Sequence, residues 1–181
     1  MPNGSLHSKG WSVRGVASED RRGLAGVSDL APDFDLPALI GGVKKRFHLR
    51  EELKQRNVVL AFYPQNWQEA SKKQMSAYQA EHAAFDKHHA EVVGISVDSI
   101  MNTTSWEREI GPLDFVICSD FWPHGEVSRA YGVFREEEPC RGMSQRAIFV
   151  VSQSGRIGFR KLYPLEKTAP IGETLEALRE L

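Results

Sequence analysis

The most reactive side chains in this sequence are its two cysteines, Cys118 and Cys140. Their spacing matches neither a metal knuckle nor a Cys-x-x-Cys redox pair, and two distant cysteines do not make a disulfide framework. Cys118 ends an apolar segment and is expected to be a small buried hydrophobic residue, because free cysteine is among the most buried residue types. Cys140 lies beside Arg141 in a polar stretch, residues 136–142, which favours an exposed and reactive thiol. An incidental loop cysteine is the alternative.

Histidine supplies the other groups that could act as acids or bases near neutral pH. His124 follows Pro123 in the segment SDFWPHG, residues 119–125, and is the candidate general acid or base. A surface or interface histidine is the alternative. No histidine has a cysteine or carboxylate at ligand spacing, so no metal site is predicted. The sequence also contains no glycine-rich loop that would bind phosphate groups, and no cofactor is expected.

Secondary structure must position these residues, and its pattern is clearest between residues 57 and 85. Residues 57–63 (NVVLAFY) form a continuous apolar run of strand length, which predicts a central strand buried on both faces. Pro64 ends this strand because proline cannot donate to the ladder. The residues that follow predict one long helix, since a stripe recurs at intervals of three and four. The stripe consists of Trp67, Ser71, Met75, Tyr78, His82 and Phe85.

The remaining pattern predicts an α/β domain. Strands are expected at residues 34–39, 43–49, 91–97, 113–118, 146–151 and 156–162, and helices at 50–55, 99–109, 125–131 and 171–181. Strands that alternate with helices and end in a hairpin indicate a mixed sheet. Residues 1–28 show neither the helical nor the strand period of hydrophobic residues. They are expected to form a flexible or loosely docked N-terminal extension, and the domain is expected at residues 29–181.

The overall composition limits the partners. Lys and Arg number 23 against 24 Asp and Glu, so the net charge of -1 gives no reason to expect nucleic acid or a membrane surface as a partner. No apolar run approaches the roughly 20 residues that span a bilayer, and the N-terminus lacks a signal-peptide core. The expectation is a cytoplasmic protein with a small-molecule or protein partner.

Several segments together resemble a known family. FYPQNWQEAS, residues 62–71, resembles the active-site segment of peroxiredoxins, whose pattern is proline, three residues, threonine or serine, two residues and cysteine. Matching segments in the same order are SVDS (96–99), SDFWPHG (119–125), SRAYGVF (128–134) and RAIFVV (146–151). The resemblance covers residues 29–181 and is closest to the one-cysteine, alkyl-hydroperoxide-reductase-like branch. It implies a thioredoxin-like fold of peroxiredoxin type, with a central mixed sheet flanked by helices.

The resemblance also assigns roles to individual positions. Pro64 matches the family's shielding proline and Arg146 its arginine, whereas Gln68 occupies the threonine position and Ser71 the cysteine position. In the family, a helix N-terminus and the guanidinium stabilise the cysteine thiolate that attacks peroxide. A serine hydroxyl lacks that acidity, and no histidine lies beside Ser71 in the sequence to act as its base. Ordinary thiol peroxidase activity is therefore not expected at this position.

These changes predict a pocket without its thiol. A helix N-terminus beside Arg146 attracts an anion or a polarised oxygen, and Gln68 and Ser71 can each donate and accept hydrogen bonds. Ordinary core packing is the alternative for the two tryptophans among the expected lining residues. That lining set is Tyr63, Pro64, Trp67, Trp122 and His124.

Three functions remain open from the sequence. The leading hypothesis is a divergent peroxiredoxin-like protein whose pocket binds or transforms a small oxygenated organic molecule without a cofactor. The second is a one-cysteine thiol peroxidase for hydrogen peroxide or alkyl hydroperoxides, present as a Cys-to-Ser form, with Cys140 as a possible alternative thiol. The third is a non-catalytic dimeric interaction module that makes contact through FWPHG, residues 121–125. A homodimer is the expected assembly.

Overall fold

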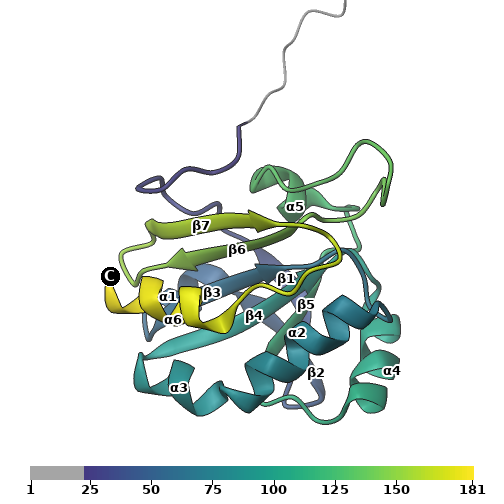
Figure 1. The fold of residues 1–181 in the computed structure, drawn as a ribbon, viewed down its shortest axis with the longest axis horizontal. Helices are drawn as coiled ribbons and strands as arrows, with labels where there is room; N and C mark the ends of the chain where they lie inside the picture. Colours follow the sequence, from purple (N-terminus) through teal and green to yellow (C-terminus); the bar gives the residue numbers. More distant parts are fainter. Residues whose placement is uncertain (1–22) are drawn as a thin grey trace, which may run out of the picture.

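A seven-stranded sheet organises residues 23–181, the part of the chain that the computed structural model describes (Figure 1). The strands are β1 (Asp35–Ile40), β2 (Val43–His48), β3 (Asn57–Phe62), β4 (Ala90–Ser96), β5 (Val116–Ser119), β6 (Arg146–Val151) and β7 (Ile157–Tyr163). The helices are α1 (Leu49–Leu53), α2 (Glu69–Ala80), α3 (His82–Lys87), α4 (Ile100–Ile110), α5 (Glu126–Ala130) and α6 (Ile171–Arg179).

The sheet is mixed, with the strand order β2-β1-β5-β4-β3-β6-β7. Strands β3, β4 and β5 are parallel, because helices carry the chain back between them. The outer pairs β1–β2 and β6–β7 are antiparallel, and so are the junctions of β1 with β5 and of β3 with β6. This arrangement confirms the α/β fold with a central mixed sheet.

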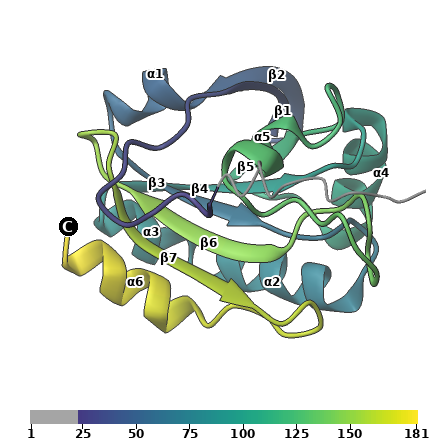
Figure 2. The same cartoon turned by 90° about the horizontal axis from the view of Figure 1, so that it is seen from above.

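Two hydrophobic clusters cover the two faces of the sheet, and β3 contributes to both. Val58, Leu60 and Phe62 belong to one cluster, while Val59 and Ala61 belong to the other. The alternation explains why the strand is a continuous apolar run. Helices α1 and α5 pack on the first face, and α2, α3, α4 and α6 on the second (Figure 2).

The single long helix predicted after β3 is wrong in two respects. It is divided into α2 and α3 at Glu81, whose ψ of 13° departs from helical geometry. Trp67 is not helical, since its φ of 65° lies in the left-handed region, and its side chain is 55% exposed. Four residues of the stripe are buried as expected, namely Ser71, Met75, Tyr78 and Phe85. His82 was expected in the core, but its side chain is 27% exposed and lies 3.5 Å from Asp86.

The predicted extension, residues 1–28, lies mostly outside the described residues. Its last part, residues 23–28, contacts the domain at β7. The amide of Ser28 donates to the carbonyl of Ile157 at 2.7 Å, and the Arg160 guanidinium donates to the carbonyl of Leu24 at 2.8 Å. Within residues 23–181, no helix has the length and apolar character needed to cross a bilayer.

Candidate functional site

Ser71 and Arg146 meet on the face of the sheet covered by α2. Ser71 is in the first turn of α2, and Arg146 is the first residue of β6. Arg146 shares its face with Ile148 and Val150, which belong to the cluster that α2 covers. Its Nη2 donates to Oγ of Ser71 at 3.4 Å, and both residues are fully buried. The predicted neighbourhood of these two residues is therefore present in the structure.

The remaining donors of Arg146 also find neutral oxygen acceptors. Nη1 donates to the amide oxygen of Gln74, and Nε and Nη2 donate to the carbonyl of Leu165 at 3.1 and 2.9 Å. Gln74 in turn donates to the hydroxyl of Tyr78 at 3.1 Å. The guanidinium is thus held in one orientation by four hydrogen bonds.

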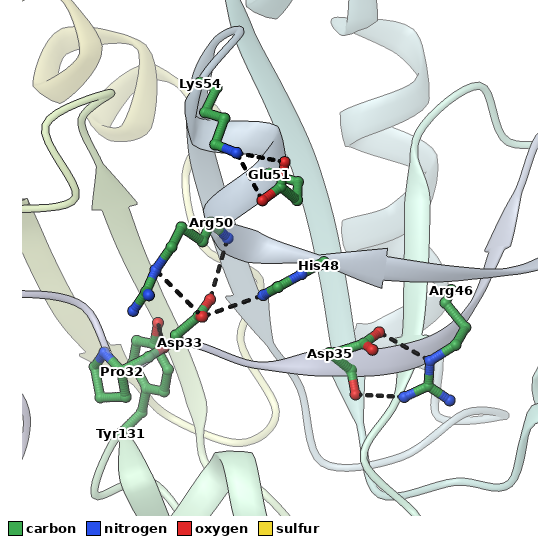
Figure 3. A network of polar contacts seen from close by, with 9 residues as sticks. All are labelled: Pro32, Asp33, Asp35, Arg46, His48, Arg50, Glu51, Lys54 and Tyr131. Atoms are coloured by element: carbon green, nitrogen blue, oxygen red, sulfur yellow. Dashed lines mark hydrogen bonds and ion pairs between the residues drawn. The ribbon is translucent and has the colours of Figure 1, made fainter.

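Arg146 is fully buried and has no carboxylate partner among the described residues, whereas several exposed cations of the chain are paired with carboxylates. Figure 3 shows such pairs near β1 and β2, where Arg46 pairs with Asp35, Arg50 with Asp33 and Lys54 with Glu51. Among residues 23–181, the hydrogen-bond partners of the Arg146 guanidinium are uncharged. Burial lowers the pKa of Arg146 to about 10, so the side chain stays protonated at neutral pH. The site therefore holds an uncompensated buried positive charge.

The start of α2 adds to this positive character. Gln68 is the N-cap residue, and its side chain makes no capping hydrogen bond. Backbone N–H groups at a helix start carry a partial positive charge, which favours anions. The Oε1 atom of Gln68 is buried without a hydrogen-bond partner among the described residues. Gln68 therefore has an unsatisfied acceptor inside the protein.

A groove of about 650 Å³ lies near Ser71 and Arg146, although neither of these buried residues lines it. Three segments form it: the first turns of α2, the loop before β6 and the loop after β7. Two lysines and two glutamates are among its lining residues, which are Gln68, Glu69, Ala70, Lys73, Pro139, Cys140, Leu165, Glu166, Lys167 and Thr168. Leu165 connects the groove to the buried charge, since its carbonyl accepts from Arg146.

None of the five residues expected to line the pocket lines the groove. Tyr63 and Pro64 are buried behind the site, and the Tyr63 hydroxyl donates to Oδ1 of Asn66 at 2.9 Å. Trp67 is on the surface, where its indole N–H donates to Asn102 at 3.1 Å. Trp122 is 80% exposed. The tryptophans are thus neither walls of the groove nor core residues.

His124 lines a separate cavity of about 750 Å³, which shares no lining residue with the groove. Its Nε2 lies 2.7 Å from the carbonyl oxygen of Gly142. Because a carbonyl oxygen can only accept, this nitrogen carries the hydrogen and donates it. His124 is therefore not placed to act as a base on a molecule beside Ser71.

The two cysteines differ as the sequence predicts. Cys118 is fully buried in β5, and burial raises the pKa of its thiol well above the usual value. Cys140 is half-buried in the groove wall, with a left-handed φ of 65°. Of the two cysteines, Cys140 is the one that lines the groove.

Sequence reasoning missed Asn66 and Gln74. Asn66 is buried, and its side chain joins Tyr63, Asn102 and Thr103 by hydrogen bonds of 2.9 to 3.2 Å. These bonds fix the loop that leads into α2. Gln74 lies three residues after Ser71 on the buried side of α2, so a polar residue on an apolar helix face was the available signal. For Asn66 no sequence pattern was available.

The comparisons with known proteins agree with this architecture. The model of the AhpC/TSA family matches residues 27–160. Alkyl hydroperoxide reductase E of Mycobacterium tuberculosis is 32% identical over 139 residues, which cover 77% of this chain and 86% of that protein. The putative peroxiredoxin ycf42 of Pyropia yezoensis is 30% identical over 161 residues, which cover 86% of this chain and 77% of the relative.

Solved structures share the fold. The reduced 2-Cys peroxiredoxin of Plasmodium vivax superposes with a TM-score of 0.78 at 22% identity, covering 84% of this chain and 80% of the other. AhpC of Mycobacterium tuberculosis superposes with a TM-score of 0.77 at 22% identity, covering 87% and 98%. The match of the family model over most of the sequence identifies the chain as a member of the AhpC/TSA family, a peroxiredoxin with a thioredoxin-like fold.

Proposed function

We propose that this chain is a divergent peroxiredoxin whose groove beside Ser71 and Arg146 binds a small oxygenated organic molecule without a cofactor. We place Ser71 at the position of the family's peroxide-attacking cysteine, so conventional peroxidase chemistry is lost there. A hydroxyl becomes a nucleophile only with a neighbouring base. Among the described residues, the hydrogen-bond partner of Ser71 is the cationic Arg146, which is no base.

The observation that carries the binding proposal is the buried charge of Arg146. A charge in a low-dielectric interior acts on a nearby anion more strongly than it would in water. The start of α2 contributes a partial positive charge from the same side. Leu165 lines the groove, and its carbonyl also accepts from Arg146. A molecule in the groove that contacts Leu165 is therefore separated from the guanidinium by this one residue. These features favour a ligand with a carboxylate or another polarised oxygen.

Gln68 and Lys73 narrow the ligand class further. Gln68 lines the groove, and its buried, unpartnered Oε1 would accept from a ligand hydroxyl once the side chain turns toward the groove, because a buried acceptor without a partner is costly. Lys73 also lines the groove and lies 3.4 Å from Glu69, an exposed pairing that contributes little. A small hydroxy acid or a related oxygenated carboxylate fits these groups best.

Lys73 and Lys72 provide a matched pair for the test. Both are exposed lysines of α2, but Lys73 lines the groove and Lys72 does not. Small oxygenated carboxylates are screened by thermal shift. We expect Lys73→Ala and Gln68→Ala to weaken binding of a hit several-fold, and Lys72→Ala to leave it unchanged. The proposal fails when no carboxylate shifts the melting temperature, or when Lys72→Ala weakens binding as much as Lys73→Ala.

A second candidate function is a one-cysteine thiol peroxidase for hydrogen peroxide or alkyl hydroperoxides, of which this chain is a Cys-to-Ser form. The surroundings of Ser71 favour it. Ser71 is in the first turn of α2 and accepts from Arg146, and a cation beside a helix start is the setting that stabilises a thiolate.

Peroxide consumption separates the two functions. Hydrogen peroxide and cumene hydroperoxide are supplied to the unaltered chain, to Ser71→Cys, and to Ser71→Cys combined with Gln68→Thr. Full activity from Ser71→Cys alone supports the peroxidase. Activity that appears only when Gln68→Thr is added supports divergence. Turnover by the unaltered chain that Cys140→Ser abolishes would assign the chemistry to Cys140.

We also propose that the chain forms a homodimer. Under the third hypothesis, the non-catalytic interaction module, this contact would be the main role of the protein. Large exposed apolar side chains follow the carboxyl ends of the parallel strands: Trp67 after β3, Met101 after β4, and Phe121 with Trp122 after β5. Exposed apolar surface of this kind favours a protein contact. Sedimentation velocity of the unaltered chain and of Trp122→Glu tests it: we expect a dimer that the substitution dissociates, and a monomeric unaltered chain would exclude the dimer.

A further inference from the structure

We propose that His124 is a positioning residue for the groove. Through its hydrogen bond to Gly142 it holds the loop of residues 135–143, and this loop supplies Pro139 and Cys140 to the groove wall. The inference deepens the proposed function and rests on it for its biological meaning, because both concern the same groove. Its test needs no ligand.

The loop of residues 135–143 is closed mainly by its own hydrogen bonds. The amide of Arg135 donates to the carbonyl of Met143 at 2.8 Å, and the amide of Gly142 donates to the carbonyl of Arg135 at 2.8 Å. The Arg135 side chain donates to the carbonyl of Pro139 at 2.7 Å. These bonds keep the shape of the loop but do not attach it to the rest of the domain.

Two polar contacts join the loop of residues 135–143 to described residues outside it. One is the 2.7 Å hydrogen bond from His124 to Gly142, and the other is a 3.4 Å ion pair between Arg129 and Glu136. The ion pair is exposed on both sides, and exposed pairs contribute little. Residues 136–139 are exposed as well, so apolar burial adds little there. The His124 bond is exposed too, but it is the shorter of the two contacts, and we take it as the main attachment.

The imidazole of His124 is itself fixed in place. Its ring meets the Phe134 ring edge-on, with centroids 5.7 Å apart, and Arg129 donates to the His124 carbonyl at 2.8 Å. The Arg129 guanidinium lies over the Phe134 ring, 3.4 Å from its centroid. An oriented donor loses little freedom when it binds, which suits a residue that holds a loop.

The cysteines make the loop directly measurable. The chain contains only Cys118 and Cys140, and Cys118 is fully buried in the sheet. The rate at which a bulky maleimide labels the folded protein therefore reports the exposure of Cys140. Hydrogen exchange of the amides in residues 135–143 provides a second measurement, which does not depend on thiol chemistry.

Two substitutions of His124 separate the hydrogen bond from the ring. His124→Phe retains an aromatic ring against Phe134 but has no N–H to donate, whereas His124→Gln retains a donor. We expect His124→Phe to raise both the labelling rate of Cys140 and the exchange rate of the loop about fivefold, the factor for one lost hydrogen bond. His124→Gln should stay close to the unaltered chain.

The inference is overturned when His124→Phe matches the unaltered chain in both rates, or when His124→Gln is as fast as His124→Phe. Labelling of Cys118 together with Cys140 would show that the whole domain opens, and it would also overturn the assignment. A groove that binds no carboxylate would be detected by thermal shift of the unaltered chain. That result leaves the loop rates as they are, so the two failures are distinguishable.

Discussion

Arg146 and Ser71 lie 75 residues apart in the chain, yet the guanidinium Nη2 donates to the serine Oγ at 3.4 Å and neither residue reaches solvent. The contact joins the first residue of β6 to the first turn of α2. A group at position 71 therefore experiences a fixed positive charge and the start of a helix together. The positive charge and the helix start both favour the ionised form of an acidic group at position 71, because that form is an anion.

A thiol introduced by Ser71→Cys should consequently ionise easily. We expect its pKa to lie below the free value of about 8.5, because Arg146 and the start of α2 outweigh burial. The measurement is a titration of thiolate ultraviolet absorbance in a Cys140→Ser background. Cys118 does not interfere, since burial keeps its pKa high.

The control for this titration is Cys140→Ser without the change at position 71, which should show no thiolate below the free value. Adding Arg146→Met to Ser71→Cys should raise the pKa of the new thiol. A thiol at position 71 that titrates above about 8.5 would show that burial dominates. The anion-attracting character of the site would then be refuted.

Arg146 should also matter for stability. Arg146→Ala leaves the Gln74 amide oxygen and the Leu165 carbonyl without their donor, and buried polar groups without partners are costly. We expect a loss of about 2–4 kcal/mol in the free energy of unfolding, measured by urea denaturation. Arg108→Ala on the exposed side of α4 is the control and should cost less than about 0.5 kcal/mol. Equal effects of the two substitutions would contradict the role assigned to Arg146.

Much of the fold was predictable because each strand signal is local. The run NVVLAFY predicts β3 correctly, since a strand buried on both faces has no polar side. The break between α2 and α3 was not predictable, because the apolar stripe continues from Tyr78 to Phe85 across Glu81. Hydrophobic periodicity shows which side of a helix faces the core. It does not reveal that a single residue within the pattern has non-helical backbone angles.

The site was predictable only in part, for a related reason. The resemblance to peroxiredoxins brought Ser71 and Arg146 together, which no local pattern could do. It did not reveal that Trp67 turns outward, because that depends on a left-handed backbone at one position. Nor did it indicate the groove wall at Cys140, which depends on how a loop of residues 135–143 closes on itself.

Glu91 should make stability depend on pH. Burial raises its pKa to about 7 from an ordinary 4.5, and Arg56, which lies 3.1 Å away and is shared with Glu52, compensates only in part. A carboxyl with a raised folded pKa contributes stability below its unfolded pKa, and this contribution is lost as the pH rises through 7. Stability should therefore fall between pH 4.5 and 7.

The comparison with Glu91→Gln isolates this group. The amide cannot ionise, so between about pH 5 and about pH 8 the variant should lose less stability than the unaltered chain, by on the order of 2–3 kcal/mol. Urea denaturation at the two pH values provides both free energies of unfolding. Parallel pH profiles for the two proteins would show that Glu91 keeps an ordinary pKa in the folded chain.

His89 should be a site where glycine stabilises the fold. It follows α3 with a φ of 48° and is exposed, in a conformation that costs an L-residue about 1 kcal/mol. His89→Gly removes this strain, and we expect the free energy of unfolding to rise by about 0.5 kcal/mol after the added freedom of the unfolded chain is subtracted. His88 has an ordinary φ of -93°, so His88→Gly should lower the free energy of unfolding by about 0.5–1 kcal/mol. Urea denaturation of both variants decides the matter: changes of the same sign would mean that the left-handed backbone at His89 is not a source of strain.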